Sequence, residues 1–406
     1  MHIISSKKIW AGSFLVIVSI YLFFAYLIAH DQICIARTND YDAGVYDVEP
    51  IAFKQLVSEM RGQATRSLIN QFDQETGFFQ YLIHPNGVVV DRDNDLRQLL
   101  TSRIFAIESH NSEVIRKYHK RNVDAIFENW YQKNGEEGYI LAQEKSKLGS
   151  NALFLRVLIE SPLYPAYKEE ARAIAQGIMS LGNDDGSFDV WYVEPGYEYD
   201  ADYLLTFYSG EALIALLEYY EVSKDQEILD FVLQTQDYYL KQYVEEIEKN
   251  YYPAYVPWHT LSLTKLYMIT GEGRYADAVF IMNDKLLELL DTEQFIGRFY
   301  NPETPEYGTP HGSSDAVYTE GLASALAVAK HAGDLEREET YRNAIRLAVS
   351  NLKKLQHKHN LWNPFYNKAI SKHLEGGIYT NICDKGMRID STAHAVDALS
   401  AIERSW

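Results

Sequence analysis

Six short segments of the chain each place one polar side chain within an apolar stretch of helical character. In most of them a small residue and an apolar residue follow the polar one, as in Glu211-Ala212-Leu213 and Glu320-Gly321-Leu322. If the six stretches are the inner helices of a ring, we expect their polar side chains to converge on its centre and form an active site. The six residues are Gln98, Asn151, Glu211, His259, Glu320 and His394.

His259 and His394 are the candidates for acid and base chemistry. Two imidazoles from facing helices could work on opposite sides of one carbon, which suits epimerisation or β-elimination. Asp390 precedes His394 by four residues and shares its helix face, where it could orient the imidazole or else cap the helix. We expect Trp258 to stack on a sugar ring, and Arg388 to hold a substrate carboxylate unless it pairs with a surface acid.

Glu211 and Glu320 offer a second mechanism, because two carboxylates across a central pocket can hydrolyse a glycosidic bond. Their separation would decide between retention and inversion at the anomeric carbon. A third arrangement uses both glutamates and both histidines as ligands of a divalent metal ion. No compact metal motif such as His-Glu-x-x-His is present, so the sequence favours a site without a cofactor. Gln98 and Asn151 also fit as hydrogen-bonded core amides.

Tyrosine is abundant, with 31 copies, and its flat apolar face and hydroxyl group suit sugar binding. The alternative is that most of these tyrosines fill half-exposed helix interfaces. Aromatic residues gather in the stretch 189–207, which we expect to form a loop on the rim of the ring. The predicted substrate-binding residues in and beside this stretch are Trp191, Asp202 and Tyr208, in addition to Trp258 and Arg388.

Two kinds of predicted helix alternate along the chain and must position these residues. One kind is charged and amphipathic, at about 50–73, 111–132, 165–181, 225–247, 274–290 and 334–357. The other kind is apolar, at about 95–107, 148–160, 209–221, 258–270, 315–331 and 390–403. Charged helices fit an outer, solvent-facing ring, and apolar helices fit a buried inner ring. The sequence predicts an all-α (α/α)6 toroid over residues 50–406, with a looser helical array as the alternative.

A glycine followed closely by an aromatic residue recurs between a charged helix and the next apolar one, which predicts a tight turn or short β-bridge. The glycines are Gly77, Gly138, Gly186, Gly297 and Gly377. The loops after these turns are often long, as at 189–207 and 300–313, whereas the opposite connections are as short as Ala332-Gly333. We expect the long loops to emerge on one rim, where a binding site belongs.

The N-terminal segment 9–29 contains no charged residue and is long enough to span a bilayer. Lys7 and Lys8 precede it, so the positive-inside tendency places residues 1–8 in the cytoplasm and the remainder outside. A cleaved signal peptide is the alternative, although this apolar region is long for one. We expect an uncleaved single-pass transmembrane anchor, a linker at 30–49 and a main domain that is periplasmic or extracellular.

The charge and cysteine content narrow the classes of function. The net charge is −19 and no long basic run occurs, which argues against nucleic-acid binding, because phosphates require clustered lysine and arginine. Two cysteines, Cys34 and Cys383, are too few for a disulfide scaffold or a zinc site of thiolates. The chain contains no P-loop, no dinucleotide fingerprint and no Gly-x-Ser-x-Gly elbow. A sugar ligand is compatible with this composition.

The alternating helices resemble the six-hairpin toroids of carbohydrate-active enzymes over about residues 50–406. Two features are similar to the N-acylglucosamine 2-epimerase superfamily, which places catalytic histidines on inner helices that include the fourth and the sixth. Here His259 lies on the fourth apolar helix and His394 on the sixth, and Pro257-Trp258-His259 is similar to that family's Pro-Gly-His. The family's following glutamate is not matched in Leu261-Ser262-Leu263-Thr264. The chain also resembles the helical domain of glucuronyl C5-epimerases, which fits an exported enzyme.

We therefore expect a membrane-anchored enzyme that processes a polysaccharide outside the cytoplasm, as an epimerase, a lyase or a glycoside hydrolase. A second class is non-catalytic: the same ring could bind glycans or serve as an assembly subunit of a cell-surface export complex. A prenyl- or terpene-binding toroid is disfavoured, because the chain lacks Asp-rich diphosphate motifs. The expected partners are a glycan, the membrane and, in the second class, other subunits of the export complex.

Overall fold

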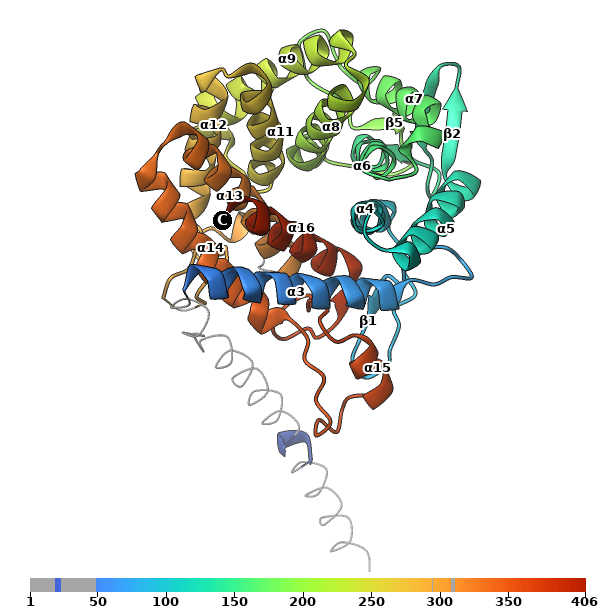
Figure 1. The fold of residues 1–406 in the computed structure, drawn as a ribbon, viewed down its shortest axis with the longest axis vertical. Coiled ribbons are helices and arrows are strands. Elements are labelled where there is room, and N and C mark those ends of the chain that lie inside the picture. The colour runs from blue at the N-terminus through green and yellow to red at the C-terminus, as the bar shows by residue number, and fades with distance from the viewer. Residues whose placement is uncertain (1–18, 23–48, 294, 308–310) are drawn as a thin grey trace, which may run out of the picture.

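Two concentric rings of helices form the main domain in the computed structural model, which describes residues 19–22, 49–293, 295–307 and 311–406 (Figure 1). The inner ring consists of α4 (Asp95–Glu108), α6 (Leu148–Ile159), α8 (Ala201–Ser223), α11 (Tyr255–Thr270), α13 (Gly312–Ala332) and α16 (Ile389–Ser405). The outer ring consists of α3 (Pro50–Gln71), α5 (Glu113–Asn129), α7 (Lys168–Met179), α9 (Gln226–Leu240), α12 (Gly273–Leu287) and α14 (Leu335–Leu355). Each outer helix precedes one inner helix in the sequence, as the alternation of charged and apolar stretches predicts.

The inner ring closes on itself. Each inner helix contacts the next one along the chain, and α16 contacts α4 as well as α13. The first outer helix, α3, packs against α16, so the two ends of the domain meet (Figure 1). The predicted (α/α)6 toroid is confirmed, and the looser helical array is wrong. The largest difference in helix bounds is at α8, which begins at Ala201 rather than near residue 209, because Asp200 caps it by accepting a hydrogen bond from the Tyr203 N–H.

The helices of the inner ring are more buried than those of the outer ring, as expected from their more apolar sequences. Every residue of α6 is buried, which fits a helix that is apolar on all sides. The outer helix α5 instead buries one stripe, which includes Ile115, Val123 and Ile126, and Ser112 caps its N-terminus. Packing between the rings therefore supplies the main stabilisation, since each fully buried leucine or isoleucine contributes ~1.5–3 kcal/mol.

Shorter elements connect the helices of the two rings. Antiparallel pairs of strands join β1 (Leu82–Ile83) to β6 (Met387–Arg388), β2 (Tyr131–Asn134) to β3 (Glu137–Ile140) and β4 (Ser146–Lys147) to β5 (Trp191–Val193). The short helical segments are η1 (Tyr164–Ala166), η2 (Lys241–Glu245), α10 (Ile247–Asn250), η3 (Pro305–Tyr307) and α15 (Lys368–His373). β6 directly precedes the inner helix α16, and β4 directly precedes the inner helix α6.

β-Bridges occur at the predicted Gly–aromatic turns. Four isolated bridges join Phe72 to Phe79, Gly182 to Phe188, Leu290 to Phe299 and Gln356 to Ile378, and the β2–β3 hairpin stands at the remaining turn. Gly77, Gly186 and Gly297 have φ values of 80°, 92° and 88°, in the left-handed region that favours glycine. At the last turn Gly376, and not the predicted Gly377, has the positive φ, of 94°.

Side chains from four inner helices fasten these turns to the ring. In each case the fourth residue of the helix accepts a hydrogen bond from a backbone N–H of the preceding turn. The pairs are Gln98 with Phe79 (2.9 Å), Asn151 with Ile140 (2.8 Å), Asp315 with Phe299 (3.1 Å) and Thr392 with Ile378 (3.0 Å). Gln98 and Asn151 are therefore hydrogen-bonded scaffold amides, and their structural equivalents are Asp315 and Thr392 rather than Glu320 and His394.

Replacing Gln98 with leucine is expected to lower the free energy of unfolding by roughly 1–3 kcal/mol, because the buried Phe79 N–H and C=O would lose their partner. Denaturant unfolding monitored by circular dichroism measures this loss. A matched substitution of the exposed Gln234 with leucine is expected to change stability by less than about 0.5 kcal/mol. Equal effects of the two substitutions would contradict the scaffold role of Gln98.

The predicted N-terminal parts fall almost entirely outside the described residues. The tail 1–8 lies outside them, as do the anchor 9–29 except for residues 19–22 and the linker 30–49 except for residue 49. Among the residues that the structure describes, no helix is both long and apolar enough to cross a membrane. The transmembrane anchor stays a prediction from the sequence.

Candidate active site

Two adjacent cavities lie among the N-terminal halves of the inner helices. Their volumes are about 460 Å³ and about 310 Å³, and both are lined by Arg97, Phe207, Trp258, Asp390 and His394. The larger cavity is also lined by His311, Ser313 and Arg388, and the smaller by Tyr208 and Glu211. Side chains from all six inner helices, including Leu153 of α6, thus meet at one place, on the side where the long loops enter the ring.

Glu211 is a buried carboxyl group at the smaller cavity. Its Oε2 atom has no hydrogen-bond partner. Burial raises the pKa of Glu211 to about 8, against the opposing influence of the positive charges of Arg156 and Lys147. The group is therefore mostly protonated at pH 7 and can donate a proton to an atom in the cavity.

The neighbouring helix α6 leaves room for this carboxyl group through Gly149. A Cβ atom at Gly149 would lie 2.5 Å from Oε2 of Glu211 and 2.6 Å from Cδ1 of Tyr208. Lys147, at the beginning of α6, forms a buried ion pair with Asp95 of α4. The position of Glu211 therefore depends on a glycine of α6, and the positive charge of the nearby Lys147 opposes the rise in the pKa of Glu211.

Replacing Gly149 with alanine is expected to displace the Glu211 carboxyl group and lower kcat by roughly 10²-fold, since a misplacement of about 1 Å has that effect. Steady-state kinetics on the substrate identified below measures this change, with circular dichroism to verify the fold. The matched control is Gly273→Ala, because nothing lies within 4 Å of a Cβ at Gly273. An unchanged kcat in Gly149→Ala would contradict the assigned position of Glu211.

His394 lines both cavities and contacts Trp258, with 5.8 Å between the ring centres. Its Nδ1 atom is buried without a hydrogen-bond partner. Burial lowers the pKa of His394 to about 4, although the negative charges of Asp390 and Asp397 oppose the shift. The imidazole is therefore neutral at pH 7 and can accept a proton.

Asp390 is held by two arginines rather than by His394. Arg388 donates to both carboxylate oxygens, at 2.5 and 2.7 Å, and Arg97 donates to Oδ2 at 2.9 Å. Burial alone would raise the pKa of Asp390, but Arg388 and then Arg97 outweigh it and lower the pKa. This corrects two expectations: Asp390 does not orient His394 through a hydrogen bond, and Arg388 directs its guanidinium fork at Asp390 and not at an incoming carboxylate.

Aromatic side chains form much of the wall of the larger cavity. They are Tyr203, Phe207, Tyr252, Trp258, Phe299, Tyr307 and Tyr318. The flat aromatic rings can stack on the faces of sugar rings, and the hydroxyl and N–H groups of tyrosine and tryptophan can hydrogen-bond to sugar hydroxyl groups. Of these residues, the sequence predicted Trp258 by name, and the aromatic stretch 189–207 contains Tyr203 and Phe207. The other aromatic residues, together with Arg97 and His311, were not predicted to bind substrate. The position of Arg97 immediately before Gln98, at the beginning of an apolar helix, was the available signal for that residue.

His259 does not line either cavity. Its Nε2 atom lies 2.9 Å from Oγ of Ser209, and its ring packs against Tyr239, Tyr243 and Tyr255. Burial lowers the pKa of His259 to about 3. The histidine therefore packs between α8, α9 and η2, and the structure corrects the expectation that His259 and His394 face each other across one carbon.

Glu320 also lies outside the two cavities. It is buried, and burial together with the negative charge of Asp397 raises its pKa to about 8, while Arg103 and Arg156 oppose the shift. Glu320 thus belongs to a group of buried charges between the inner helices and does not form a carboxylate pair with Glu211 in a shared cavity. The alternative metal site of two glutamates and two histidines is not assembled either, because His259 and Glu320 do not line the cavities. The described residues contain no group of three or more metal-ligating side chains that could hold a metal ion.

Two predicted substrate-binding residues lie away from the cavities. Trp191, on β5, is buried with its ring 5.4 Å from that of Tyr199. Asp202 is exposed in the first turn of α8. Of the residues expected to bind substrate, Trp258, Arg388 and Tyr208 line the cavities, and Trp191 and Asp202 do not.

Comparison with protein families finds one match that covers most of the toroid. The model described as beta-L-arabinofuranosidase, GH127 catalytic domain, matches residues 53–304. No curated protein matches this sequence. The suspected relationship to carbohydrate-active toroid enzymes is thereby confirmed at the level of the family.

Solved structures with the same fold include several carbohydrate-active enzymes. A D-mannose isomerase has a TM-score of 0.63 with 11% identity, over 89% of this chain and 100% of its own. An alpha-1,6-mannanase of Salegentibacter sp. HEL1_6 has a TM-score of 0.58 with 14% identity, over 86% of this chain and 100% of its own. An unsaturated glucuronyl hydrolase specific for heparin has a TM-score of 0.56 with 11% identity, over 86% and 97%. At these identities the likeness shows the fold.

Proposed function

Because the chain belongs to the family of the beta-L-arabinofuranosidase GH127 catalytic domain, we propose that it is an enzyme that hydrolyses glycosidic bonds in a glycan. The observation that carries this proposal is that a protonated acid, Glu211, and a neutral imidazole, His394, both line the smaller cavity, together with Phe207, Tyr208 and Trp258. Two titratable groups with pKa values shifted in opposite directions are typical of an acid and a base that act together.

The proposed reaction assigns one role to each group. Glu211 donates its proton to the glycosidic oxygen as the bond to the anomeric carbon breaks, and the leaving alcohol departs neutral. Water attacks the anomeric carbon and gives one proton to His394, whose imidazolium form the negative charge of Asp390 stabilises. Exchange of protons with solvent then restores both groups.

Asp390 is a poor alternative to His394 as the base. Both of its oxygens accept hydrogen bonds from arginine side chains, and its lowered pKa disfavours protonation. We propose that the Arg97–Asp390–Arg388 cluster instead fixes the wall of the cavity and binds sugar hydroxyl groups. Epimerisation or lysis through two histidines is disfavoured, because His259 does not line the cavity.

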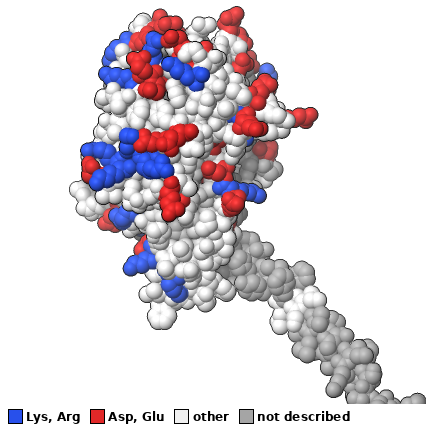
Figure 2. Space-filling view, turned by 90° about the vertical axis from the view of Figure 1, so that its right-hand side faces the viewer, with Lys and Arg blue, Asp and Glu red and all other residues white. Residues whose placement is uncertain are grey.

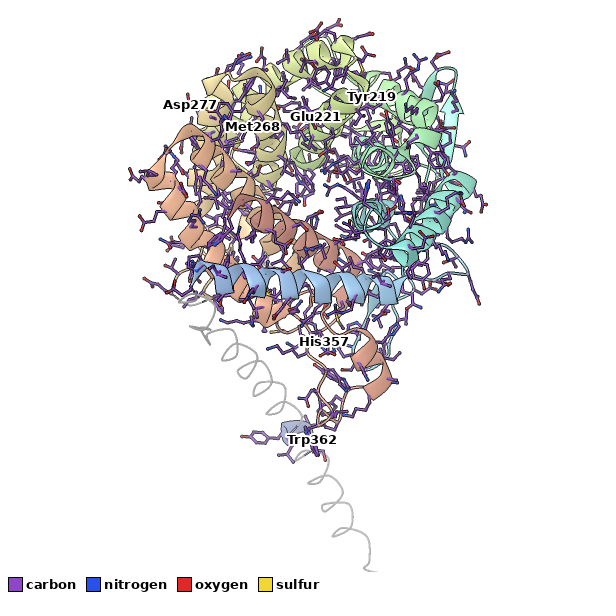
Figure 3. The ribbon with its side chains drawn as sticks, in the orientation of Figure 1. Tyr219, Glu221, Met268, Asp277, His357 and Trp362 are labelled. Carbon is purple, nitrogen blue, oxygen red and sulfur yellow. The ribbon has the colours of Figure 1, made fainter. Side chains whose placement is uncertain are left out.

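The proposal is tested with the purified full chain on a panel of glycans: β-L-arabinofuranosides, α-1,6-mannan oligosaccharides and unsaturated glucuronyl oligosaccharides. The wild-type chain is expected to release reducing sugar from at least one class, and Glu211→Gln to release almost none. Glu221→Gln, on the exposed part of the same helix (Figure 3), is the matched control and is expected to retain activity. Glycan binding without turnover by the wild-type chain across the panel would favour the non-catalytic glycan-binding role instead.

We also propose that the enzyme is anchored in a membrane by residues 9–29 with its toroid outside the cytoplasm. The uncharged length of this segment and the preceding Lys7 and Lys8 support the proposal. The chain is expected to stay in the membrane pellet after alkaline extraction, and the toroid is expected to be digested by protease added outside intact spheroplasts. Release by alkali, or protection from the protease, would contradict this location.

A further inference from the structure

A lobe of residues 358–373 projects from the toroid between the outer helix α14 and the turn before α16 (Figure 1). It includes α15 and carries three large apolar side chains that are mostly exposed: Leu361 (64%), Trp362 (92%) and Phe365 (74%). Trp362 lies at the far end of the lobe, and the buried His357 lies at its base (Figure 3). Exposed apolar groups gathered at one tip indicate a surface that meets another apolar phase or partner.

Val88 is another exposed apolar side chain, on a turn that contacts the lobe. It belongs to the turn between β1 and the loop before α4, and the N–H of Asn367 donates to the carbonyl of Pro85 in the same turn at 2.9 Å. A Cβ at Gly87 would lie 3.5 Å from Asn367. The turn and the lobe are therefore in contact at Asn367.

The charge of the lobe is opposite to that of the protein. Residues 358–373 contain three lysines, Lys358, Lys368 and Lys372, all exposed, and no aspartate or glutamate, whereas the whole chain has a net charge of −19. The lower end of the molecule, where Figure 1 places α15, is mostly uncharged in Figure 2 and carries basic side chains. An apolar tip with lysines on the same lobe is complementary to an anionic lipid surface. The apolar side chains can enter the bilayer interior, and the lysines can bind the negatively charged headgroups.

Hydrogen bonds at its base hold the lobe in this position. Asn70 of α3 and His373 exchange two hydrogen bonds, at 2.6 and 2.7 Å between side chain and backbone atoms. His357 contacts the carbonyl of Ser371 at 2.9 Å and the hydroxyl of Tyr379 at 2.5 Å. The base of the lobe is thus fastened to the toroid, and the apolar tip at its other end is exposed.

We propose that this lobe is a membrane-docking element: Leu361, Trp362 and Phe365 insert into the interface of an anionic bilayer, and the three lysines bind its headgroups. Tryptophan suits this place, because its ring is apolar and its N–H can reach water. The inference rests on the proposed location at a membrane and adds a second contact, made by the folded domain itself. The lobe would hold the toroid in a fixed orientation against the lipid surface.

The test uses the full chain reconstituted in vesicles of phosphatidylcholine with phosphatidylglycerol, with or without brominated acyl chains, which quench tryptophan emission by contact. The emission of Trp362 is obtained as the difference between the wild-type chain and Trp362→Phe, because the chain has six tryptophans. This difference is expected to shift to shorter wavelength and to be lost with brominated lipid. The corresponding difference for Trp130→Phe, in the outer ring, is expected to be insensitive to bromine.

Replacing Lys358, Lys368 and Lys372 together with glutamine is expected to weaken the quenching of Trp362 on anionic vesicles and to leave it unchanged on phosphatidylcholine alone. Emission of Trp362 that stays unquenched by brominated lipid overturns the proposal. Protection of Trp362 from aqueous iodide in the absence of vesicles also overturns it, because another part of the protein or a second copy would then cover the tip. Flotation with vesicles and glycan hydrolysis report separately on the proposed anchor and activity, so their failure is distinguishable from failure of the lobe.

Discussion

Replacing Glu211 with glutamine is expected to lower kcat for glycan hydrolysis by roughly 10²–10⁴-fold, the usual contribution of a positioned general acid. The amide keeps the shape of the side chain but has no acidic proton to donate to the glycosidic oxygen. The fold is expected to persist, because Oε2 of Glu211 makes no hydrogen bond that the amide would break. Initial rates on the best substrate of the panel, with circular dichroism spectra of both proteins, measure the effect.

The pH dependence supplies an independent check on the same residue. Burial raises the pKa of Glu211 to about 8, so kcat/KM of the wild-type chain is expected to fall as the pH rises through about 8. The acidic limb is expected near pH 4, where His394 becomes protonated. Full activity well above pH 9, or a Glu211→Gln variant as active as the Glu221→Gln control, would contradict the assignment.

The stability of the folded chain is also expected to fall as the pH rises. Folding raises the pKa of Glu211 from 4.5 to about 8, so the folded chain retains a proton that the unfolded chain releases. The free energy of unfolding of the wild-type chain is therefore expected to decrease progressively as the pH rises from about 4.5 to about 8, by an amount on the order of a few kcal/mol. Glu211→Gln has no carboxyl group at this position and is expected not to show this decrease. Denaturant unfolding of both proteins at pH 5 and pH 8 measures it, and an equal difference at the two pH values would contradict the raised pKa.

Replacing Arg103 with methionine is expected to lower the free energy of unfolding by roughly 3–5 kcal/mol, because breaking a buried ion pair leaves its partners uncompensated. Arg103 donates to Asp397 at 2.9 Å and to Glu160 at 3.0 Å, and only 7% of its side chain is exposed. Next to it, Arg156 contacts Glu218 at 2.7 and 3.0 Å. Thermal or denaturant unfolding measures the loss.

The control is an exposed ion pair on the outer ring. Lys120 and Asp124 are four residues apart on α5 and face solvent, so Lys120→Gln is expected to cost less than about 1 kcal/mol. A small effect of Arg103→Met, comparable to that of the control, would show that the buried charges are not coupled as the structure indicates. A partial rescue in the double variant Arg103→Met/Asp397→Leu is expected, because it removes one of the stranded carboxylates.

The alternation of charged and apolar stretches was sufficient to predict the ring. Each helix buries either one stripe or its whole circumference, and composition alone separates the two cases, as α5 and α6 show. The Gly–aromatic turns could also be predicted from the sequence. Gly77 and Gly297 have a positive φ, which favours glycine, and the glycines can be read directly from the sequence. These are local consequences of sequence and need no knowledge of distant contacts.

The site was harder to predict, because the polar–small–apolar sequence pattern does not determine which side of each helix faces the centre of the ring. Gln98 and Asn151 are the fourth residues of their helices, whereas His259 is the fifth of α11 and Glu320 the ninth of α13. Each added residue turns a side chain by about 100°. The true equivalents of Gln98 are Asp315 and Thr392, which the choice of polar–small–apolar strings passed over.

The orientation of each helix about its axis also explains which of the predicted residues line the cavities. Glu211 and His394 lie on the sides of α8 and α16 that face the cavities, while His259 turns toward the tyrosines of α9 and η2. Arg97 enters the site from α4 next to a scaffold glutamine, and only the closed ring brings it to Asp390, 293 residues away in sequence. Contacts of this kind depend on closure and cannot be derived from one segment.

The most direct test of the central claim is a crystal structure of Glu211→Gln bound to the oligosaccharide that the wild-type enzyme cleaves best. We expect the scissile glycosidic oxygen to lie about 3 Å from the side chain at position 211, and the His394 ring to lie on the opposite side of the anomeric carbon. We also expect a ring of Trp258 or of the neighbouring tyrosines to stack on the sugar. A sugar bound elsewhere on the toroid, with both cavities empty of it, would contradict the claim.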